Sequence, residues 1–385
     1  MSTAQKAKLC YVLPFYDPAT ATHYAHLYEL LESASRELDI YLIVGRAATD
    51  ARPGIFAHAH VLGESGRFGM ALGYLRAIVG ARVRGYRTFY VHYHVLASLI
   101  AVAVAHTSKG RVFIWRCVTT RRYFAPWSLK PSLLGRKLFL DWPTVLLFKM
   151  VHRLVTCSDF MARYYSAQFG MRESRMRVLP NWVNRERFRL EGMSSEEARQ
   201  RLGLPQDRPV VLFLHTVGEH KGAHLVCPVA RRVAEEVPGV LFVVAGDGPY
   251  SQRLHEEIVE LGLADVVWCV GSVPNREAPT YFRAADLFIN PASDESFGRV
   301  LIEAMAAGVP FVSTDGGGGV LAFVGPRQRR YVVPTDDVSA FARAVVEVLQ
   351  NADTAGQLVE EGTSIAEAHS LEVATKRFVE LVTER

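Results

Sequence analysis

The chain has 385 residues, and 49% of them are apolar, which excludes a disordered protein and leaves room for two globular domains. The net charge is only +5, but it is unevenly placed: residues 1–185 hold 25 Lys and Arg against 10 Asp and Glu, and the remainder holds 19 against 29. Between Glu64 and Asp141 there are 13 Lys or Arg and no acid. This half should attract an anionic partner, such as nucleic acid, phospholipid or a phosphate-bearing substrate.

The cysteines and the apolar runs indicate in which cellular compartment the protein resides. None of the five cysteines forms a CxxC pair, so we expect isolated thiols in a reducing compartment rather than a zinc site or a disulfide framework. The N-terminus lacks the long apolar stretch of a signal peptide. The apolar run 95–105 is too short to span a bilayer and predicts a buried helix. We therefore expect a cytoplasmic protein.

Short apolar runs alternate with helical stretches along the whole chain. This rhythm predicts an α/β protein with two open parallel sheets and a cleft between them, where ligands sit beyond the carboxyl ends of the strands. A charged stretch without strands, 184–209, is the expected hinge. In the first half, the expected strands are 8–15, 40–45, 88–94, 111–117, 153–158 and 176–181, with helices over 23–38 and 159–170. In the second half, the expected strands are 209–216, 240–248, 266–273, 287–292 and 310–314, with helices over 222–236, 249–261, 277–284, 298–307, 336–350 and 366–383.

The stretch 119–150 mixes Arg and Lys with aromatic and leucine side chains. This mixture is typical of an interfacial helix on an anionic leaflet, and equally of a surface helix packed on its own domain. On the membrane interpretation, Arg121 and Arg122 would suit the diphosphate of a polyprenyl-linked acceptor. No nucleic-acid reader motif accompanies the stretch, so we expect no nucleic acid as a partner.

Two carboxylates, Glu295 and Glu303, stand eight positions apart at a loop-to-helix boundary in "DESFGRVLIEAMAAGVP". The helix that opens at Gly298 offers unpaired N–H groups and its dipole to a phosphate, and Arg299 adds a positive charge. Glu303 lies in an apolar run, where an ionised carboxylate needs donors such as a pair of ribose hydroxyls. The glycines of 315–319 let the backbone approach a ligand closely. The alternative is an ordinary amphipathic helix, with Glu303 at its surface and Glu295 as a capping acid.

The segment "DESFGRVLIEAMAAGVPFVSTDGGG" resembles the E-x7-E signature of retaining glycosyltransferases of family GT4. Segments 152–188, 211–226, 243–249, 270–298 and 331–345 resemble further motifs of that family, in order and spacing. The resemblance implies the GT-B fold, with two Rossmann-like parallel α/β domains facing each other across a cleft. The N-terminal acceptor-binding domain would cover 1–183, the nucleotide-sugar-binding domain 184–365, and a C-terminal helix in 366–385 would cross back to the first domain.

The resemblance also implies roles for single residues. Lys221 would bind the diphosphate of the donor, and Glu295 would contact and position the donor sugar, so these two are the catalytic candidates. Glu303 would hold the ribose hydroxyls. Backbone N–H groups at the start of the helix would hold phosphate or sugar, and the base would lie near 246–248 and 270–273. The donor-binding candidates are Glu303, Phe297, Gly298, Arg299, Val300, Thr216, Gly246 and Val273.

Transfer of a sugar from a nucleotide requires positive charge near the departing diphosphate, which protein side chains can supply in place of a metal ion. Negative charge builds on the departing diphosphate, which a lysine and a helix N-terminus stabilise. No DxD-type acidic pair is evident, so we expect no metal and no cofactor beyond a UDP- or GDP-sugar donor. The resemblance implies retention of configuration, and on the membrane interpretation of 119–150 we expect a glycan or polyprenyl-linked acceptor. The corresponding process is cell-surface polysaccharide or glycoconjugate biosynthesis, by a protein held peripherally on the inner face of the membrane.

Several positions depart from the family pattern. Thr216 stands where the family usually has an arginine, and the N-terminal Gly-Gly loop is replaced by "DPATATHYAHL". The acceptor-side candidates are Thr22, His94, Arg116, Arg121 and Arg122, although a lone histidine such as His94 is often structural. Two rival functions remain open. One is a sugar-nucleotide-binding protein without turnover, and the other is a dinucleotide oxidoreductase with an incomplete GxGxxG turn at 246–251.

Overall fold

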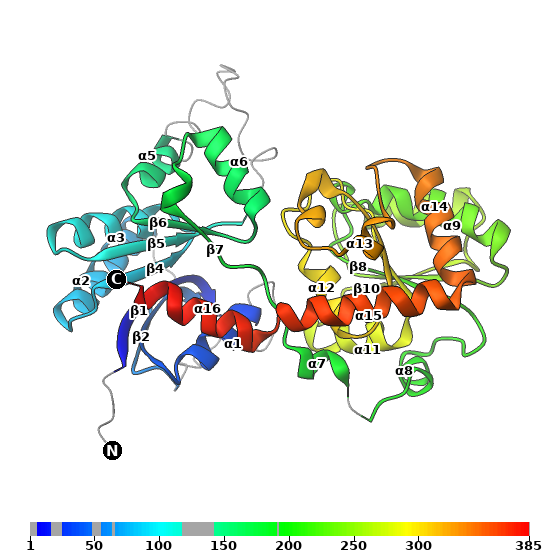
Figure 1. Cartoon of the computed structure of the whole chain (residues 1–385), viewed down its shortest axis with the longest axis horizontal. Helices are drawn as coiled ribbons and strands as arrows, with labels where there is room; N and C mark the ends of the chain where they lie inside the picture. The colour runs from blue at the N-terminus through cyan, green and yellow to red at the C-terminus, as the bar shows by residue number, and fades with distance from the viewer. Residues whose placement is uncertain are drawn as a thin grey trace. The chain divides into compact units, whose positions relative to one another are not determined.

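The chain forms two separate α/β units. The computed structural model describes residues 6–16, 25–47, 55–63, 66–117, 142–190 and 192–384. The first unit comprises Met1–Pro180 and Glu372–Arg385, and the second comprises Asn181–Leu371. Each is built on one parallel sheet with helices packed on it (Figure 1). Two parallel-sheet units are what the alternation of apolar runs and helical stretches predicts.

The first sheet has, in the described part of the chain, seven strands in the order β3-β2-β1-β4-β5-β6-β7. Leu9 to Leu13 of β1 are all buried, as expected for a parallel strand covered on both faces. The strands are β1 (Ala7–Tyr16), β2 (Leu38–Ala47), β3 (His58–Val61), β4 (Thr88–His92), β5 (Arg111–Trp115), β6 (Arg153–Thr156) and β7 (Met176–Val178). The helices are α1 (Ala25–Ala34), α2 (Arg67–Val83), α3 (Val95–Thr107), α5 (Trp142–Met150), α6 (Asp159–Phe169) and α16 (Leu371–Thr383).

The second sheet has six strands within the described residues, in the order β10-β9-β8-β11-β12-β13. Its strands are β8 (Val210–Leu214), β9 (Leu241–Ala245), β10 (Val267–Gly271), β11 (Leu287–Asn290), β12 (Phe311–Thr314) and β13 (Val332–Val333). Its helices are α7 (Arg185–Arg189), α8 (Ser195–Leu202), α9 (Ala223–Glu236), α10 (Ser251–Glu260), α11 (Ala278–Ala284), α12 (Arg299–Ala306), α13 (Pro326–Arg329), α14 (Val338–Gln350) and α15 (Ala352–Ala368). The predicted strands of both halves are confirmed, whereas β3 and β13, which are short, were not predicted.

The C-terminal helix α16 packs on the first sheet. The ring of Phe378 lies 6.1 Å from that of Tyr11 and 5.2 Å from that of Tyr90, and Arg111 donates a hydrogen bond of 3.0 Å to the carbonyl of Val382. Figure 1 shows α16, in red, along the strands of this unit. The C-terminal segment is therefore part of the first hydrophobic core.

The helix expected over 366–383 is confirmed as α16, but it begins later than predicted, because a break separates it from α15. α15 ends at Ala368 and α16 begins at Leu371. The break coincides with a backbone pairing: Val183 N–H donates to the His369 carbonyl, and Leu371 N–H donates to the Val183 carbonyl, both at 3.0 Å. The two points where the chain leaves one unit for the other are thus joined by hydrogen bonds.

The charged stretch 184–209 has no strand in its described residues, as predicted, and carries two short helices. Helix α8 begins with a capping box, in which the Ser194 hydroxyl accepts from Glu197 N–H and the Glu197 carboxylate accepts from Ser194 N–H. Both orphan donors of the helix start are satisfied locally. The stretch belongs to the second unit rather than forming a free linker.

The helix expected over 95–105 is confirmed as α3, but only one of its faces is buried. The buried residues are Ala97, Ser98, Ala101, Val102 and Ala105. No helix in the described part of the chain is long and apolar enough to cross a membrane.

Candidate active site

Three loops of the second unit meet at one edge of its sheet. The loop after β8 carries Lys221, the loop after β11 carries Glu295, and the loop after β12 carries the glycines of 315–319. Strands β8, β11 and β12 are parallel neighbours, so their carboxyl ends lie side by side. This edge is where open α/β sheets place their ligands.

Lys221 and Glu295 form an ion pair, with 2.7 Å between Nζ and Oε2. Both side chains are largely shielded from solvent, and Glu295 also accepts a hydrogen bond from the Gly298 N–H. Burial alone would raise the pKa of Glu295, but the charge and hydrogen bond of Lys221 outweigh it and hold that pKa below its ordinary value. Glu295 is therefore an ionised carboxylate that neutralises the lysine.

Glycines bring the three loops into contact. A Cβ at Gly222, directly after the lysine, would lie 2.1 Å from the carbonyl oxygen of Pro291. A Cβ at Gly319 would lie 1.9 Å from the carbonyl oxygen of Glu295, and Glu295 N–H donates 2.9 Å to the Gly316 carbonyl. No larger residue fits between these backbones, so the glycines hold Lys221 and Glu295 at pairing distance.

Helix α12 begins beside this ion pair. Its N-cap Gly298 has φ 81°, a left-handed conformation that favours glycine, and no side chain caps the helix. Phe297 and Val300 are buried, so the chain enters the helix at a fixed angle. Gly298 N–H donates to Glu295 and Leu301 N–H donates to the Gly298 carbonyl, so the N–H groups of Arg299 and Val300 are the ones offered to a ligand at the predicted anion site.

Glu303 is 8% exposed and lies one turn into α12. Its Oε1 is 3.4 Å from Nε of Arg299. The alternative interpretation, with Glu303 on an exposed helix face, is therefore wrong. Arg299 does supply positive charge at the helix start, but in this structure that charge is shared with Glu303.

A polar network that sequence reasoning missed lies under the ion pair. Nε2 of His215 is 2.8 Å from Oδ1 of Asn290, whose Nδ2 donates 2.9 Å to Oγ of Ser313. Burial, and to a lesser degree the charge of Lys221, lower the pKa of His215 to about 3, so its imidazole is neutral. The available signal was the presence of Asn290 and Ser313, two polar residues within otherwise apolar strand runs.

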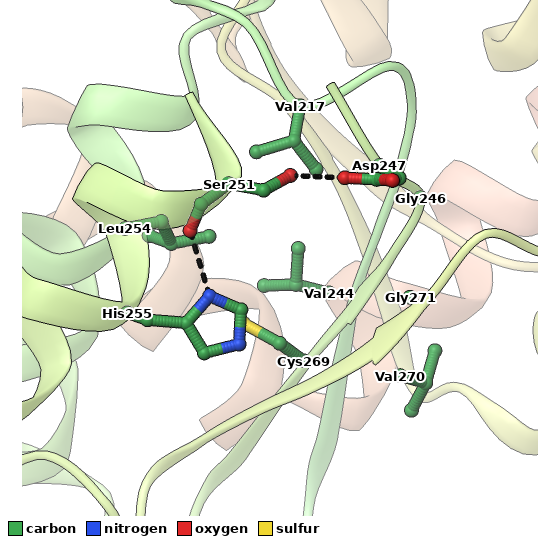
Figure 2. A pocket seen from close by; sticks show the side chains of 10 residues that line it. All are labelled: Val217, Val244, Gly246, Asp247, Ser251, Leu254, His255, Cys269, Val270 and Gly271. Carbon is green, nitrogen blue, oxygen red and sulfur yellow. Dashed lines mark hydrogen bonds between the residues drawn. The ribbon is translucent and has the colours of Figure 1, made fainter. Parts of the chain in front are cut away.

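A pocket of about 260 Å³ lies between α10 and the ends of β9 and β10 (Figure 2). Its apolar wall includes Val217, Val244 and Cys269, and its rim carries the carboxylate of Asp247. That carboxylate accepts from Ser251 Oγ at 2.6 Å, which Figure 2 shows as a dashed line. The pocket is lined by apolar side chains together with polar groups from Asp247, Ser251 and His255, a mixture that suits a nucleobase.

The remaining donor-side predictions lie around this pocket. Gly246 lines it, and a Cβ there would lie 1.8 Å from the His215 carbonyl oxygen. Thr216, beside the lining residue Val217, is exposed. Val273 follows β10 and is not among the lining residues. The loops after β8, β9 and β10 therefore supply one side of the site, and those after β11 and β12 the other.

The acceptor-side candidates lie in the first unit. His94 caps α3: its Nδ1 accepts from Ala97 N–H at 3.3 Å, and burial lowers its pKa. Arg116 is buried, with its guanidinium 3.8 Å from the centre of the Tyr93 ring. These contacts explain both residues as parts of the fold. Thr22, Arg121 and Arg122, and the predicted interfacial stretch before Trp142, lie outside the described residues.

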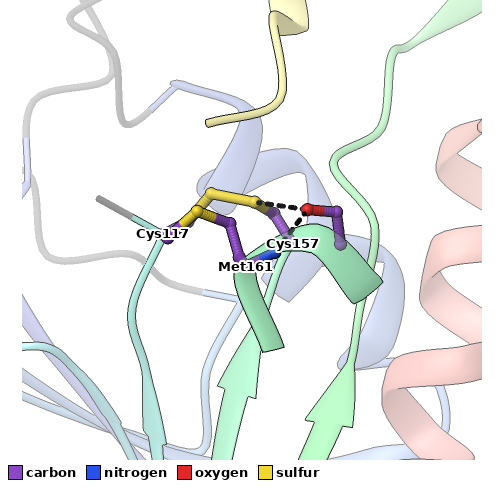
Figure 3. The surroundings of a disulfide bond; sticks show 4 residues. Cys117, Cys157 and Met161 are labelled. Atoms are coloured by element: carbon purple, nitrogen blue, oxygen red, sulfur yellow. Dashed lines mark hydrogen bonds between the residues drawn. A yellow bond between two sulfur atoms is a disulfide. The ribbon is translucent and has the colours of Figure 1, made fainter. Parts of the chain in front are cut away.

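The expectation of isolated thiols is wrong for two cysteines, because Cys117 and Cys157 form a disulfide (Figure 3). Each follows the carboxyl end of one of two neighbouring parallel strands, β5 and β6, so residues 40 positions apart meet at one edge. Spacing along the sequence could not reveal this pair. Cys10 and Cys227 are buried free thiols, and Cys269 is partly exposed.

Metal ligands do not gather in the described part of the chain. No group of three or more His, Cys, Asp or Glu side chains is placed there to hold a metal ion.

Residues 194–364 match the family Glycosyl transferases group 1. Among curated proteins, the 2-deoxystreptamine glucosyltransferase of Streptomyces kanamyceticus is 29% identical over 199 residues, covering 51% of each chain. The GDP-mannose-dependent alpha-(1-6)-phosphatidylinositol monomannoside mannosyltransferase of Mycobacterium tuberculosis is 31% identical over 205 residues, covering 51% of this chain and 52% of its own. The chain thus spans about half the length of the curated relatives that it matches.

Solved structures match over nearly the whole chain. HepE from Anabaena, in complex with UDP, has a TM-score of 0.78 at 17% identity, covering 98% of this chain and all of its own. WaaG, a glycosyltransferase involved in lipopolysaccharide biosynthesis, has a TM-score of 0.71 at 15% identity with the same coverage. The predicted fold class is confirmed: two parallel α/β domains, as in glycosyltransferases of the GT-B fold.

The close approach at Gly222 should be essential to the site. Gly222→Ala adds a Cβ that collides with Pro291 at positive φ, so we expect a loss of about 2–5 kcal/mol in the free energy of unfolding. Gly239→Ala is the matched control, because Gly239 also has positive φ (80°) but nothing within 4 Å of its Cβ. It should cost only about 1–2 kcal/mol. Urea unfolding of both variants measures the difference, and equal losses would refute the steric constraint.

The neutral His215 should make stability depend on pH. Its pKa is about 3 in the folded protein and about 6.5 in the unfolded chain, so the unfolded state binds more protons between these values. Stability should fall as pH drops from about 6.5 towards 3. Replacing His215 by Gln should make this slope shallower by up to about one proton, measured by urea unfolding at several pH values. An unchanged slope would contradict the assignment.

The disulfide should stabilise the first domain. For a loop of 40 residues the chain-entropy relation gives about 4 kcal/mol. Dithiothreitol should therefore lower the melting temperature of the wild type and leave the Cys117→Ser, Cys157→Ser variant unchanged. An equal response of both proteins would show that the two sulfurs are not bonded.

Proposed function

We propose that this protein is a retaining, metal-independent glycosyltransferase that moves a sugar from a nucleotide-sugar to an acceptor hydroxyl. One observation carries the proposal: the Lys221–Glu295 ion pair lies beside the uncapped start of α12, with Glu303 buried one turn further on. A lysine, free helix N–H groups and a shielded carboxylate provide the contacts that a nucleoside diphosphate needs.

Binding of the donor would exchange partners in two ion pairs. Glu295 holds Lys221, and Glu303 holds Arg299. A diphosphate placed at the helix start draws both cations towards itself. The ribose hydroxyls then replace Arg299 as donors to Glu303, and Glu295 turns to the hydroxyls of the sugar. No isolated charge is left in the shielded site at any stage, which keeps the desolvation cost low.

The same groups would favour the chemical step. The anomeric C–O bond to the diphosphate breaks while the acceptor oxygen forms its bond on the same face of the sugar, and the acceptor proton passes to the departing phosphate oxygen. Negative charge grows on that oxygen, and Lys221 and the α12 N–H groups stabilise it more in the transition state than in the ground state. Two aligned cations at this position would do the work of a metal ion.

The donor base would occupy the pocket beside Gly246 and Val217. Its apolar walls suit the faces of a base, and the Asp247 loop offers polar edge contacts. HepE, a structural neighbour, is described in complex with UDP-glucose, and one curated relative is described as GDP-mannose-dependent. A UDP- or GDP-sugar is therefore the proposed donor.

The acceptor is proposed to be a glycan or a lipid-linked glycan bound by the first domain. Names of the similar proteins include a phosphatidylinositol monomannoside mannosyltransferase and a lipopolysaccharide glycosyltransferase. Together with the excess of positive charge in the first half, they support glycoconjugate or polysaccharide biosynthesis by a peripherally bound protein.

A thermal-shift screen against UDP-, GDP-, ADP- and dTDP-sugars tests the donor proposal. A ligand that binds only the folded protein at 100 times its Kd adds about 2.7 kcal/mol of stability. We expect one base to stabilise the protein selectively, and slow release of the free nucleotide on incubation. Binding without release would instead favour the binding protein without turnover, and a response to nicotinamide dinucleotides alone would favour the oxidoreductase.

The ribose assignment has a sharper test. Glu303→Ala should weaken binding of the selected nucleoside diphosphate by about 10–100-fold, because a charged hydrogen-bond acceptor is lost. Binding of the 2′,3′-dideoxy analogue should be equally weak in the wild type and the variant, since that ligand has no hydroxyls for Glu303. Glu347→Ala, which removes a carboxylate on α14 that accepts from Tyr331, is the control. Equal losses for both ligands would refute the assignment; calorimetry measures them.

A further inference from the structure

Helix α2 is apolar on two opposite faces. Its inner face is formed by Tyr74, Ala77, Ile78 and Ala81, all of which are buried. Its outer face carries large apolar side chains at successive helical positions, all of them exposed. A helix at the surface of a soluble protein normally has polar side chains on its solvent-facing side, unlike α2. The outer residues are Phe68, Leu72, Leu75, Val79 and Val83.

This exposure is unusual within the molecule. Phe68 is 85% exposed and Val83 81%, so these side chains make almost no contact with the rest of the chain. Of the 14 large apolar side chains exposed in the described part of the chain, eight lie on α2 and α5. An apolar surface concentrated in this way marks an interaction site.

The neighbouring helices extend the same surface. α2 packs against α3, and α3 packs against α5. Figure 1 shows the three helices on one side of the first sheet. Between Val95 and Thr107, α3 has no Asp, Glu, Lys or Arg. On α5, Trp142 is 65% exposed, and Leu146 and Met150 point outward with it. We call the exposed residues of α2 and α5 the apolar layer.

The charge around the apolar layer has one sign. Residues 66–117 and 142–158 contain ten Lys and Arg and no Asp or Glu. By helical position, Arg76 and Arg82 flank the outer stripe of α2 on its two sides, and Arg76 is exposed. Lys149 is exposed on α5. Long basic side chains beside an apolar stripe can reach from it to an anionic plane.

We propose that the apolar layer of α2 and α5 lies in the headgroup region of an anionic lipid bilayer. The apolar side chains enter the acyl boundary, and the arginines contact lipid phosphates, as in interfacial amphipathic helices. Helix α2, of 17 residues, is about 25 Å long and would lie in the plane of the membrane. No part of the described chain needs to cross the bilayer.

Charge favours a membrane over a second copy of the chain. In a symmetric dimer the same patch meets itself, so the arginines of one copy would face those of the other without any carboxylate between them. An anionic leaflet offers the opposite charge over the whole surface. The proposal stands apart from the donor site, which lies in the other domain and can fail or hold independently.

Flotation with vesicles tests the proposal on the full-length protein. It should bind vesicles of phosphatidylcholine with phosphatidylglycerol, bind pure phosphatidylcholine much more weakly, and be released by high salt. Val83→Ser should lower the partition coefficient by about tenfold, and Val259→Ser, an equally exposed (78%) helical valine of the second domain, should leave it unchanged. The triple variant Phe68→Ser, Leu75→Gln, Val83→Ser should abolish binding.

A second pair of variants measures the contribution of arginine charge to vesicle binding. Arg76→Gln should weaken binding to anionic vesicles about fivefold, and Arg231→Gln, on α9 of the second domain, should not. Brominated lipids should quench Trp142 fluorescence, and Trp142→Phe should remove that quenching while the protein still binds. Thermal unfolding and donor-induced stabilisation serve to show that each variant is folded.

Three outcomes would overturn the proposal. One is equal binding to neutral and anionic vesicles. Another is equal loss in the Val83 and Val259 variants. The third is a wild type that is dimeric without lipid and becomes monomeric in the triple variant, which would assign the apolar layer to a second copy.

Discussion

The ion pair between Lys221 and Glu295 is the contact on which the geometry of the second domain's site depends. Removing two charges from water costs several kcal/mol, and the pair persists because a 2.7 Å contact and a backbone N–H compensate for that cost. Such a contact requires that the loops after β8 and β11 approach almost to van der Waals distance. Gly222 makes this approach possible, and Gly319 lets the loop after β12 reach the backbone of Glu295. The direction of α12 follows, since its N-cap Gly298 comes three positions after Glu295.

The neutral network beneath the pair has a complementary role. Lys221, Arg299 and two carboxylates already balance their charges. A further cation below them would upset that balance, and burial prevents His215 from becoming one. His215, Asn290 and Ser313 therefore support the site by hydrogen bonds alone.

Most strands were readable from the sequence because parallel strands buried on both faces are continuous apolar runs, as β8 and β11 show. The missed strands β3 and β13 contain two to four residues, and β3 includes two histidines. Helix α15 was missed and α16 was extended too far, because the break at His369 depends on pairing with Val183, which is distant in sequence. Contacts between residues distant in sequence also limited what could be predicted about the site. The burial of Glu303 was readable from its apolar neighbours, whereas its contact with Arg299 and the Cys117–Cys157 bond depend on three-dimensional neighbours.

The uneven charge of the chain matches two different ways of recognising an anion. In the second domain, where acids outnumber bases, the cations of the site are few, shielded and held by carboxylates, which selects a ligand by geometry. In the first domain, Arg76 on α2 is exposed and lacks carboxylate neighbours along the chain, so its attraction for an anion is long-ranged and salt-dependent. Shielded cations paired with carboxylates suit a phosphate group that must be positioned for a reaction. Exposed cations suit an anionic membrane surface, which only has to be attracted and bound. The placement of acids along the sequence, scarce in the first half and abundant in the second, matches these two proposed modes of binding.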